Sequence, residues 1–178
     1  GLINRYLVPG FDYPVTLLEI QKLIYFLKVA GEDFDRIQFE ANYYGPYSDT
    51  LRHVLNTMDG HFISGYGDGQ NKPDTPINMI PEAVSEALRY LEDYPDTQER
   101  FDYVADLIKG FETPYGMELL ATVHWATTQM NPEAAKNPDL ALDIIKHWNT
   151  RKAKLMKQEH INVAWSQLKD RSWFELSV

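Results

Sequence analysis

Residues 16–32, TLLEIQKLIYFLKVAGE, decide the fold, because they carry the clearest helix signals in the chain. Thr16 followed three residues later by Glu19 is a capping box, which satisfies two backbone donors at a helix start. Gly31 suits the left-handed residue that ends many helices. The spacing predicts a helix with an apolar core face and a polar, aromatic outer face. The core face holds Leu17, Ile20, Leu23, Ile24, Leu27 and Ala30, and the outer face holds Gln21, Lys22, Tyr25 and Lys28.

The same stretch continues through NYYGPYSDTLRHVLN at 42–56 and GHFISGYGDG at 60–69. Gly45-Pro46 predicts a turn, and a 3.6-residue period predicts a helix over 49–58. Alternating or short apolar runs predict short β-strands near 37–43, 62–66 and 77–80, the last two paired with each other.

The second half of the chain reads as a series of helices. The long apolar segment MELLATVHWATTQM at 117–130 is apolar on most of its circumference, which predicts a buried central helix. The last helix carries Ile161, Ala164, Trp165 and Leu168 on its core stripe. Helix starts are predicted at Pro81, at a cap-like pair of Asp96 and Glu99, at Thr113-Pro114 and at Asn137-Pro138.

These elements predict a mainly α protein, a compact bundle of six to seven helices with a short strand pair or hairpin. At 178 residues and 44% apolar, the chain is long enough for one well-buried core. We expect residues 1–15, which carry Pro9 and Pro14, to be a lead-in or linker segment, and residues 16–178 to form a single domain.

The charge balance argues against a general nucleic-acid binder, because 26 acidic side chains outnumber 17 basic ones. The acid is concentrated between Asp74 and Asp106, with nine acidic and two basic residues. That stretch is either a solvated surface or an interaction face for a basic partner. The sequence has no run of 18 apolar residues, so we predict no membrane span. The lack of cysteine excludes disulfides and thiolate metal sites and fits a cytoplasmic location.

No catalytic motif emerges from the sequence. It contains no G-x-S-x-G, P-loop or H-E-x-x-H pattern, and the glycines at 65, 67 and 69 lack the strand and helix that a phosphate-binding loop requires. The five histidines are scattered, and His124 is expected to be a hydrogen-bonded core residue. We therefore predict no catalytic residues, no metal site and no cofactor.

Tyrosines beside glycines supply the positive signal, since they form rigid contact surfaces at low entropic cost. Tyr44, Tyr47 and Tyr66 are predicted at the surface, whereas Tyr43 and Phe62 are predicted to pack loops onto the core. The outer face of the first helix joins this surface if the Gly45-Pro46 turn folds back over it.

Several longer motifs resemble a known family. QKLIYF at 21–26, with the Tyr-Gly-Pro-Tyr turn, resembles the Panacea-type antitoxin domain. GHFISGYGDG at 60–69, DLIKGFETPYGMELLATVHWA at 106–126, and the patterns W-N-x-R-K and H-I-x-V-A-W-x-x-L further on resemble the C-terminal domain of DarG-type antitoxins. The resemblance extends from about Tyr6 to Trp173.

The resemblance implies a noncatalytic domain that binds a DarT-type DNA ADP-ribosyltransferase toxin and covers its single-stranded-DNA site by acidic DNA mimicry. It implies an N-terminal macrodomain in cis, which would carry the DNA ADP-ribosyl glycohydrolase activity outside this chain, and no direct contact with nucleic acid. The residues proposed to bind the toxin are Gln21, Lys22, Tyr25, Tyr44, Tyr47, His61, Tyr66, Asp68, Glu92, Asp93, Glu99 and Asp102.

Two alternatives remain open. The segment 146–171 holds seven basic and two acidic residues and would serve as the basic face of a DNA-binding or adaptor domain. A cryptic enzyme would need His61, Asp68 and His124 to converge on one pocket. The residues Gln21, Lys22 and Tyr25 and the Gly45-Pro46 turn either brace the fold or form part of a contact surface.

Overall fold

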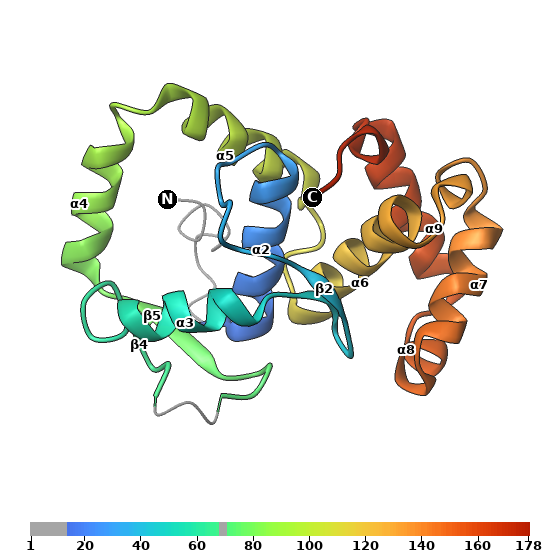
Figure 1. Ribbon diagram of the computed structural model, residues 1–178, viewed down its shortest axis with the longest axis horizontal. Helices are drawn as coiled ribbons and strands as arrows, with labels where there is room; N and C mark the ends of the chain where they lie inside the picture. The colour runs from blue at the N-terminus through green and yellow to red at the C-terminus, as the bar shows by residue number, and fades with distance from the viewer. Residues whose placement is uncertain (1–13, 68–70) are drawn as a thin grey trace.

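The computed structural model describes residues 14–67 and 71–178, and within these ranges the chain is mainly helical. Eight α-helices, α2 to α9, are joined by short π and 3₁₀ segments and by five short strands. Figure 1 shows α2 in the middle of the view, with α3, α4 and α5 on one side and α6 to α9 on the other. The predicted fold class, a mainly α bundle with a short β-component, is confirmed.

Helix α2 (Leu17–Val29) begins and ends where the sequence predicts. The Glu19 carboxylate accepts from the Thr16 backbone N–H at 2.7 Å, and the Thr16 hydroxyl accepts from the Glu19 N–H at 3.3 Å. Gly31 adopts a φ of 95° just beyond the last turn. The capping box and the glycine therefore fix both ends of the helix around which the other elements pack.

The strands form two small antiparallel sets. β2 (Glu40–Asn42) and β3 (Gly45–Tyr47) make a hairpin, with Ala41 opposite Pro46. In the second set, β5 (Pro76–Met79) pairs with β1 (Val15–Thr16) on one edge and with β4 (Ile63–Ser64) on the other. The predicted pairing of the segments near 62–66 and 77–80 is confirmed.

Helices α3 (Asp49–Met58), α4 (Pro81–Leu91) and α5 (Pro95–Leu107) follow around one side of α2. Ser48 caps α3 by accepting from the Leu51 N–H at 3.3 Å. The predicted capping pair of Asp96 and Glu99 is wrong, because α5 already begins at Pro95 and its N-cap residue, Tyr94, makes no side-chain cap bond. The proline supplies the start instead, since its fixed φ suits the first helical position.

Helix α6 (Pro114–Trp125) is the predicted central helix, and ten of its twelve residues are buried. Thr113 caps it by accepting from the Gly116 N–H at 2.9 Å. It continues as the π-helix η1 (Ala126–Met130), followed by the 3₁₀ helix η2 (Pro132–Ala135). The chain then returns along α6 through α7 (Pro138–Trp148), α8 (Thr150–Leu155), α9 (Gln158–Asp170) and the 3₁₀ helix η3 (Trp173–Glu175).

The core lies where α2 packs against α6. Tyr25 and Phe26 of α2 contact the ring of His124, and Phe26 meets Trp173 edge to face at 5.5 Å. Tyr25 is fully buried, so the predicted outer face of α2 is wrong at this residue. Gln21 and Lys22 are also buried, because the β2–β3 hairpin covers them.

Three aromatic predictions are wrong. Tyr66, predicted at the surface, is 1% exposed, whereas Tyr43 and Phe62, predicted to pack inward, are 49% and 45% exposed. Alternation along an irregular glycine-rich loop does not fix which side chain turns inward, and Tyr66 is turned inward after Gly65, whose φ is 95°. The predicted lead-in segment 1–15 falls mostly outside the described residues and stays a prediction. Among the described helices, none has the length and apolar character needed to cross a membrane.

Candidate functional site

A buried charge cluster ties α6 to α8. Glu118, 1% exposed, accepts from both terminal nitrogens of Arg151, at 2.6 and 3.0 Å, and from Lys152 Nζ at 2.7 Å. Burial by itself would raise the pKa of the Glu118 carboxyl, but the bonds from Arg151 and Lys152 outweigh it and hold this pKa below its usual value. Glu118 is therefore a fixed, ionised carboxylate.

Two lysines complete this cluster. Lys152 is fully buried and also donates to Thr122 Oγ1 at 3.2 Å, and burial lowers its pKa. Lys22 of α2 donates to the Pro46 carbonyl at 2.7 Å. Burial, together with repulsion from Lys152, lowers the pKa of Lys22 to about 7, although Glu118 partly opposes the shift. Arg151 and Lys152 thus share the Glu118 carboxylate, and Lys22 lies in its field without a direct bond to it.

The β2–β3 hairpin sits directly on this cluster. A Cβ at Gly45, whose φ is 93°, would come within 2.8 Å of Thr122 Oγ1, so only glycine allows this close approach. Gln21 fixes Ser48, the residue that follows the hairpin. Its side-chain amide donates to the Ser48 carbonyl at 2.9 Å and accepts from the Ser48 N–H at 3.0 Å. The polar residues of α2 therefore brace the hairpin.

The tip of the hairpin is held by α7 and α8. Trp148 Nε1 donates to the Asn42 carbonyl and Asn149 Nδ2 to the Tyr43 carbonyl, both at 3.0 Å. The Arg151 guanidinium lies 4.6 Å from the centre of the Tyr44 ring, a cation–π contact. Tyr44 is consequently held at the surface in a fixed orientation.

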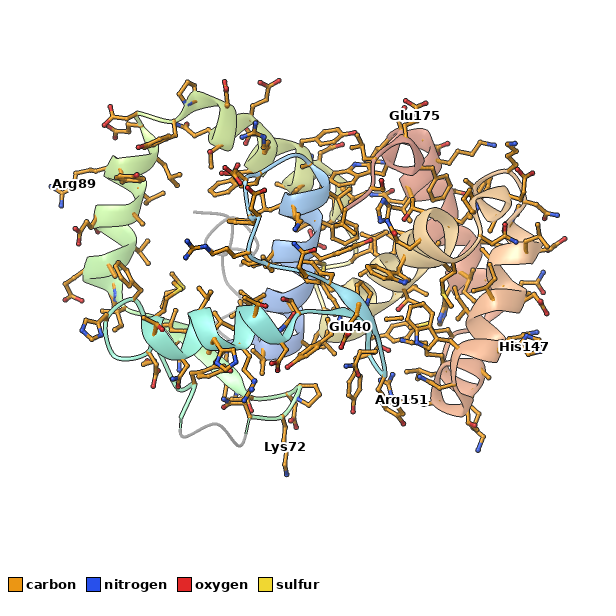
Figure 2. The ribbon with its side chains drawn as sticks, in the orientation of Figure 1. Glu40, Lys72, Arg89, His147, Arg151 and Glu175 are labelled. Carbon is orange, nitrogen blue, oxygen red and sulfur yellow. The ribbon has the colours of Figure 1, made fainter. Side chains whose placement is uncertain are left out.

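Two adjoining clefts meet at Tyr44. The larger, about 630 Å³, is lined by Tyr44, Lys72, Tyr115, Glu118 and Arg151. The smaller, about 270 Å³, is lined by Gln21, Lys22, Tyr44, Tyr47, Arg52 and Asn71. Figure 2 shows Lys72 and Arg151 along the same edge of the molecule, with Arg151 beside the hairpin. We call the two clefts together the Tyr44 clefts.

The structure brings four of the sequence-predicted site residues together. Gln21, Lys22, Tyr44 and Tyr47 line the smaller cleft. Tyr25 and Tyr66 are instead buried in the core, with the Tyr25 hydroxyl 2.6 Å from His124 Nδ1. The exposed residues of the set lie away from the Tyr44 clefts: they are His61, Glu92, Asp93, Glu99 and Asp102. Asp68 lies outside the described residues.

The alternative of an enzyme built on His61, Asp68 and His124 finds no support in the described residues. His124 is fully buried, and its Nε2 lies 3.0 Å from both the Trp173 and Leu176 carbonyls while Nδ1 faces Tyr25. Burial lowers the pKa of His124 to about 4. His61 is exposed on the loop after α3. His124 is therefore the predicted core histidine and is closed to a substrate.

The predicted basic face at 146–171 is wrong as a continuous surface. Lys152 is buried, and Arg151 pairs with Glu118. Arg171 pairs with Asp106 at 2.9 Å. Three of the seven basic side chains therefore hold α8 and α9 to the rest of the protein, whereas the other four are exposed: Lys146, Lys154, Lys157 and Lys169.

Glu118, Arg151 and Lys152 were missed by the sequence reasoning. The available signal was a carboxylate inside MELLATVHWA, a helix apolar on all sides, because a buried charge requires a charged partner. Among the described residues, no three His, Cys, Asp or Glu side chains gather as a metal site.

Comparison with known proteins finds relatives that are named as an enzyme. No family model matches the chain. A Thermus aquaticus protein named DNA ADP-ribosyl glycohydrolase is 43% identical over 158 residues, 89% of this chain. Proteins of the same name from Mycobacterium tuberculosis and Mycobacterium bovis are 36% identical over 159 residues, 86% of this chain. The chain spans 42% to 44% of the length of these relatives.

These relatives correct the functional predictions. The interpretation as the C-terminal domain of a DarG-type antitoxin is overturned, because the matching proteins are named as glycohydrolases. The same names overturn the predictions of a non-enzyme, of toxin inhibition by DNA mimicry, and of an adaptor function. They also overturn the prediction of a DarT-type toxin as partner and of no direct contact with nucleic acid, since the printed name refers to DNA. The macrodomain in cis stays a prediction.

Proposed function

We propose that the protein containing this chain is a DNA ADP-ribosyl glycohydrolase, and that the Tyr44 clefts hold its DNA substrate. One observation carries the proposal: basic and tyrosine side chains line two adjoining clefts in a chain of net charge −9. The names of the relatives support the class of reaction.

The lining suits a DNA strand. The basic side chains at the clefts are Lys22, Arg52, Lys72 and Arg151, and the larger cleft also holds the carboxylates of Asp74 and Glu118. Lysine and arginine bind backbone phosphates, and aromatic rings stack on bases with little regard to sequence. Tyr44, Tyr47 and Tyr115 lie beside those cations. A stacking ring needs an unstacked base, so the clefts suit single-stranded DNA or an extruded nucleotide.

The role we assign to the clefts is to hold the substrate, not to cleave the bond. Glu118 lines the larger cleft, but both its oxygens accept from cations. Such a carboxylate stays ionised, whereas a general acid in glycoside cleavage needs a raised pKa. The activity proposed for the whole protein is based on the names of its relatives. This chain spans 42% of the length of the Thermus aquaticus relative.

Binding of a fluorescent single-stranded oligonucleotide to the chain tests the role of the clefts. Three to four phosphate contacts predict that log K falls with log salt with a slope of about −2 to −3. The double variant Arg52→Gln/Lys72→Gln should bind more weakly and with a shallower slope. The matched control is Lys146→Gln/Lys154→Gln, which changes exposed lysines of α7 and α8 outside the clefts. Equal losses in both double variants would contradict the assignment.

We keep a cytoplasmic location as a proposal. It is supported by the absence of cysteine from the sequence, which is typical of proteins that do not depend on disulfides. Fractionation of cells that express the protein, followed by detection with an antibody, tests it directly.

A further inference from the structure

Lys22 is one of the residues that line the smaller Tyr44 cleft. It is 1% exposed, and its Nζ donates to the Pro46 carbonyl at 2.7 Å. An ammonium group has three N–H donors, so this carbonyl satisfies only part of its capacity. The cleft beside it is also lined by Arg52, whose side chain is 43% exposed and whose Nε donates to Asp49 Oδ1 at 3.0 Å. Two basic groups thus border one small cavity.

The nearby carboxylate is already engaged. Glu118 accepts from Arg151 through both oxygens and from Lys152 through Oε1. Lys22 therefore feels the negative charge of Glu118, but the described residues show no direct bond between the two side chains. A buried cation without a paired anion is costly. An anion entering the smaller cleft would relieve that cost.

We propose that the smaller cleft is a phosphate-binding subsite, in which Lys22 and Arg52 hold a phosphate group of a nucleotide while Tyr44 and Tyr47 flank its sugar or base. The inference rests on the proposed function for the identity of the nucleotide. Phosphate is common to the DNA backbone and to the ADP-ribose adduct, so either supplies the group. The smaller cleft, of about 270 Å³, adjoins the larger one of about 630 Å³, so a strand bound in one can continue into the other.

A bound phosphate has a consequence that can be measured at Lys22. The pKa of Lys22 is lowered to about 7, so at pH 8 about nine tenths of this amine is neutral. A phosphate beside Nζ favours the charged form and raises the pKa. Binding at pH 8 should therefore take up close to one proton.

Other groups facing Lys22 must be separated from this effect. Glu118 of α6 is ionised, and Arg52 of α3 is charged and paired with Asp49 of the same helix. Burial raises the pKa of Tyr47 on β3, which keeps it neutral at pH 8. Lys152 of α8 also has a lowered pKa and is the other group able to take up a proton. Lys22→Met removes the first amine and retains the second, so it separates the two.

Isothermal titration calorimetry at pH 8, in two buffers of different ionisation enthalpy, counts the protons. The probes are inorganic phosphate, ADP-ribose and a thymidine pentanucleotide. We expect uptake of about 0.9 proton per ligand in the natural protein. Lys22→Met should abolish the uptake and weaken binding at least tenfold, and circular dichroism checks that it folds. Arg52→Gln alters an exposed side chain and should weaken binding several-fold while uptake persists.

Each outcome has one meaning. Unchanged affinity and uptake in folded Lys22→Met, or unchanged affinity in Arg52→Gln, would overturn the phosphate subsite even if the oligonucleotide binds. Binding of ADP-ribose with proton uptake, without any binding of the pentanucleotide, would support the subsite and assign it to the adduct. Binding of the pentanucleotide with the same uptake assigns it to the DNA backbone. If no probe binds, both the subsite and the DNA-holding role fail.

Discussion

Replacing Glu118 by Gln should strongly destabilise the protein, because it leaves Arg151 and Lys152 without their carboxylate. Removing one partner of a buried ion pair costs about 3–5 kcal/mol. Lys152 is fully buried, whereas the Arg151 side chain is 29% exposed and can reach water, so we expect a cost of about 3 kcal/mol. For a domain of this size, about 2–4 °C per kcal/mol predicts a fall in Tm of roughly 6–12 °C.

Urea denaturation and thermal melts followed by circular dichroism measure this cost. The matched control is Glu133→Gln, which breaks a pair with Lys136 whose side chains are 68% and 76% exposed, and which should cost less than about 1 kcal/mol. Because the folded pKa of Glu118 is below its ordinary value of 4.5, its contribution is present above pH 4.5 and is lost as the pH falls through the folded pKa. Equal costs for the two variants at pH 7 would refute the reasoning.

Three further predictions address the hairpin, the core histidine and the larger cleft. Gly45→Ala should cost more than Gly60→Ala in urea melts, because both positions have positive φ but only the first places a Cβ 2.8 Å from a threonine hydroxyl. Because the pKa of His124 is about 4 in the folded protein and 6.5 ordinarily, the unfolded chain takes up a proton at His124 at a higher pH than the folded protein does. Stability should thus fall by up to about 3 kcal/mol as the pH drops from 6.5 to 4, and His124→Gln should remove this slope. Tyr44→Ala should weaken oligonucleotide binding by about 1–3 kcal/mol in an anisotropy titration, whereas the exposed control Tyr90→Ala should leave it unchanged.

The helix boundaries were largely predictable from local chemistry. Thr16 with Glu19, Thr113 before Pro114, and Asn137 before Pro138 act through bonds to neighbouring backbone groups, so their effect is readable from adjacent residues. The cap expected at Asp96 failed because a proline one residue earlier already begins the helix.

The site was harder to predict, because it depends on contacts between distant segments. Lys22 and Gln21 look solvent-facing on a helical wheel, yet a hairpin more than twenty residues away covers them. Glu118 lies 33 residues from Arg151, and periodicity gives no pairing over that distance. A charge within an apolar helix signals that a partner exists without identifying it. The function predicted from motif resemblance was overturned by the names of the relatives.

The central claim is that the Tyr44 clefts hold the DNA substrate of a glycohydrolase. The most direct test measures release of ADP-ribose from an ADP-ribosylated single-stranded oligonucleotide by the full-length protein, with and without Arg52→Gln and Tyr44→Ala. We predict release by the natural protein, and in the double variant a KM raised at least tenfold with kcat nearly unchanged, because substrate holding is lost and the chemistry is not. The absence of release by the natural protein, or an unchanged KM in the folded double variant, would contradict the account.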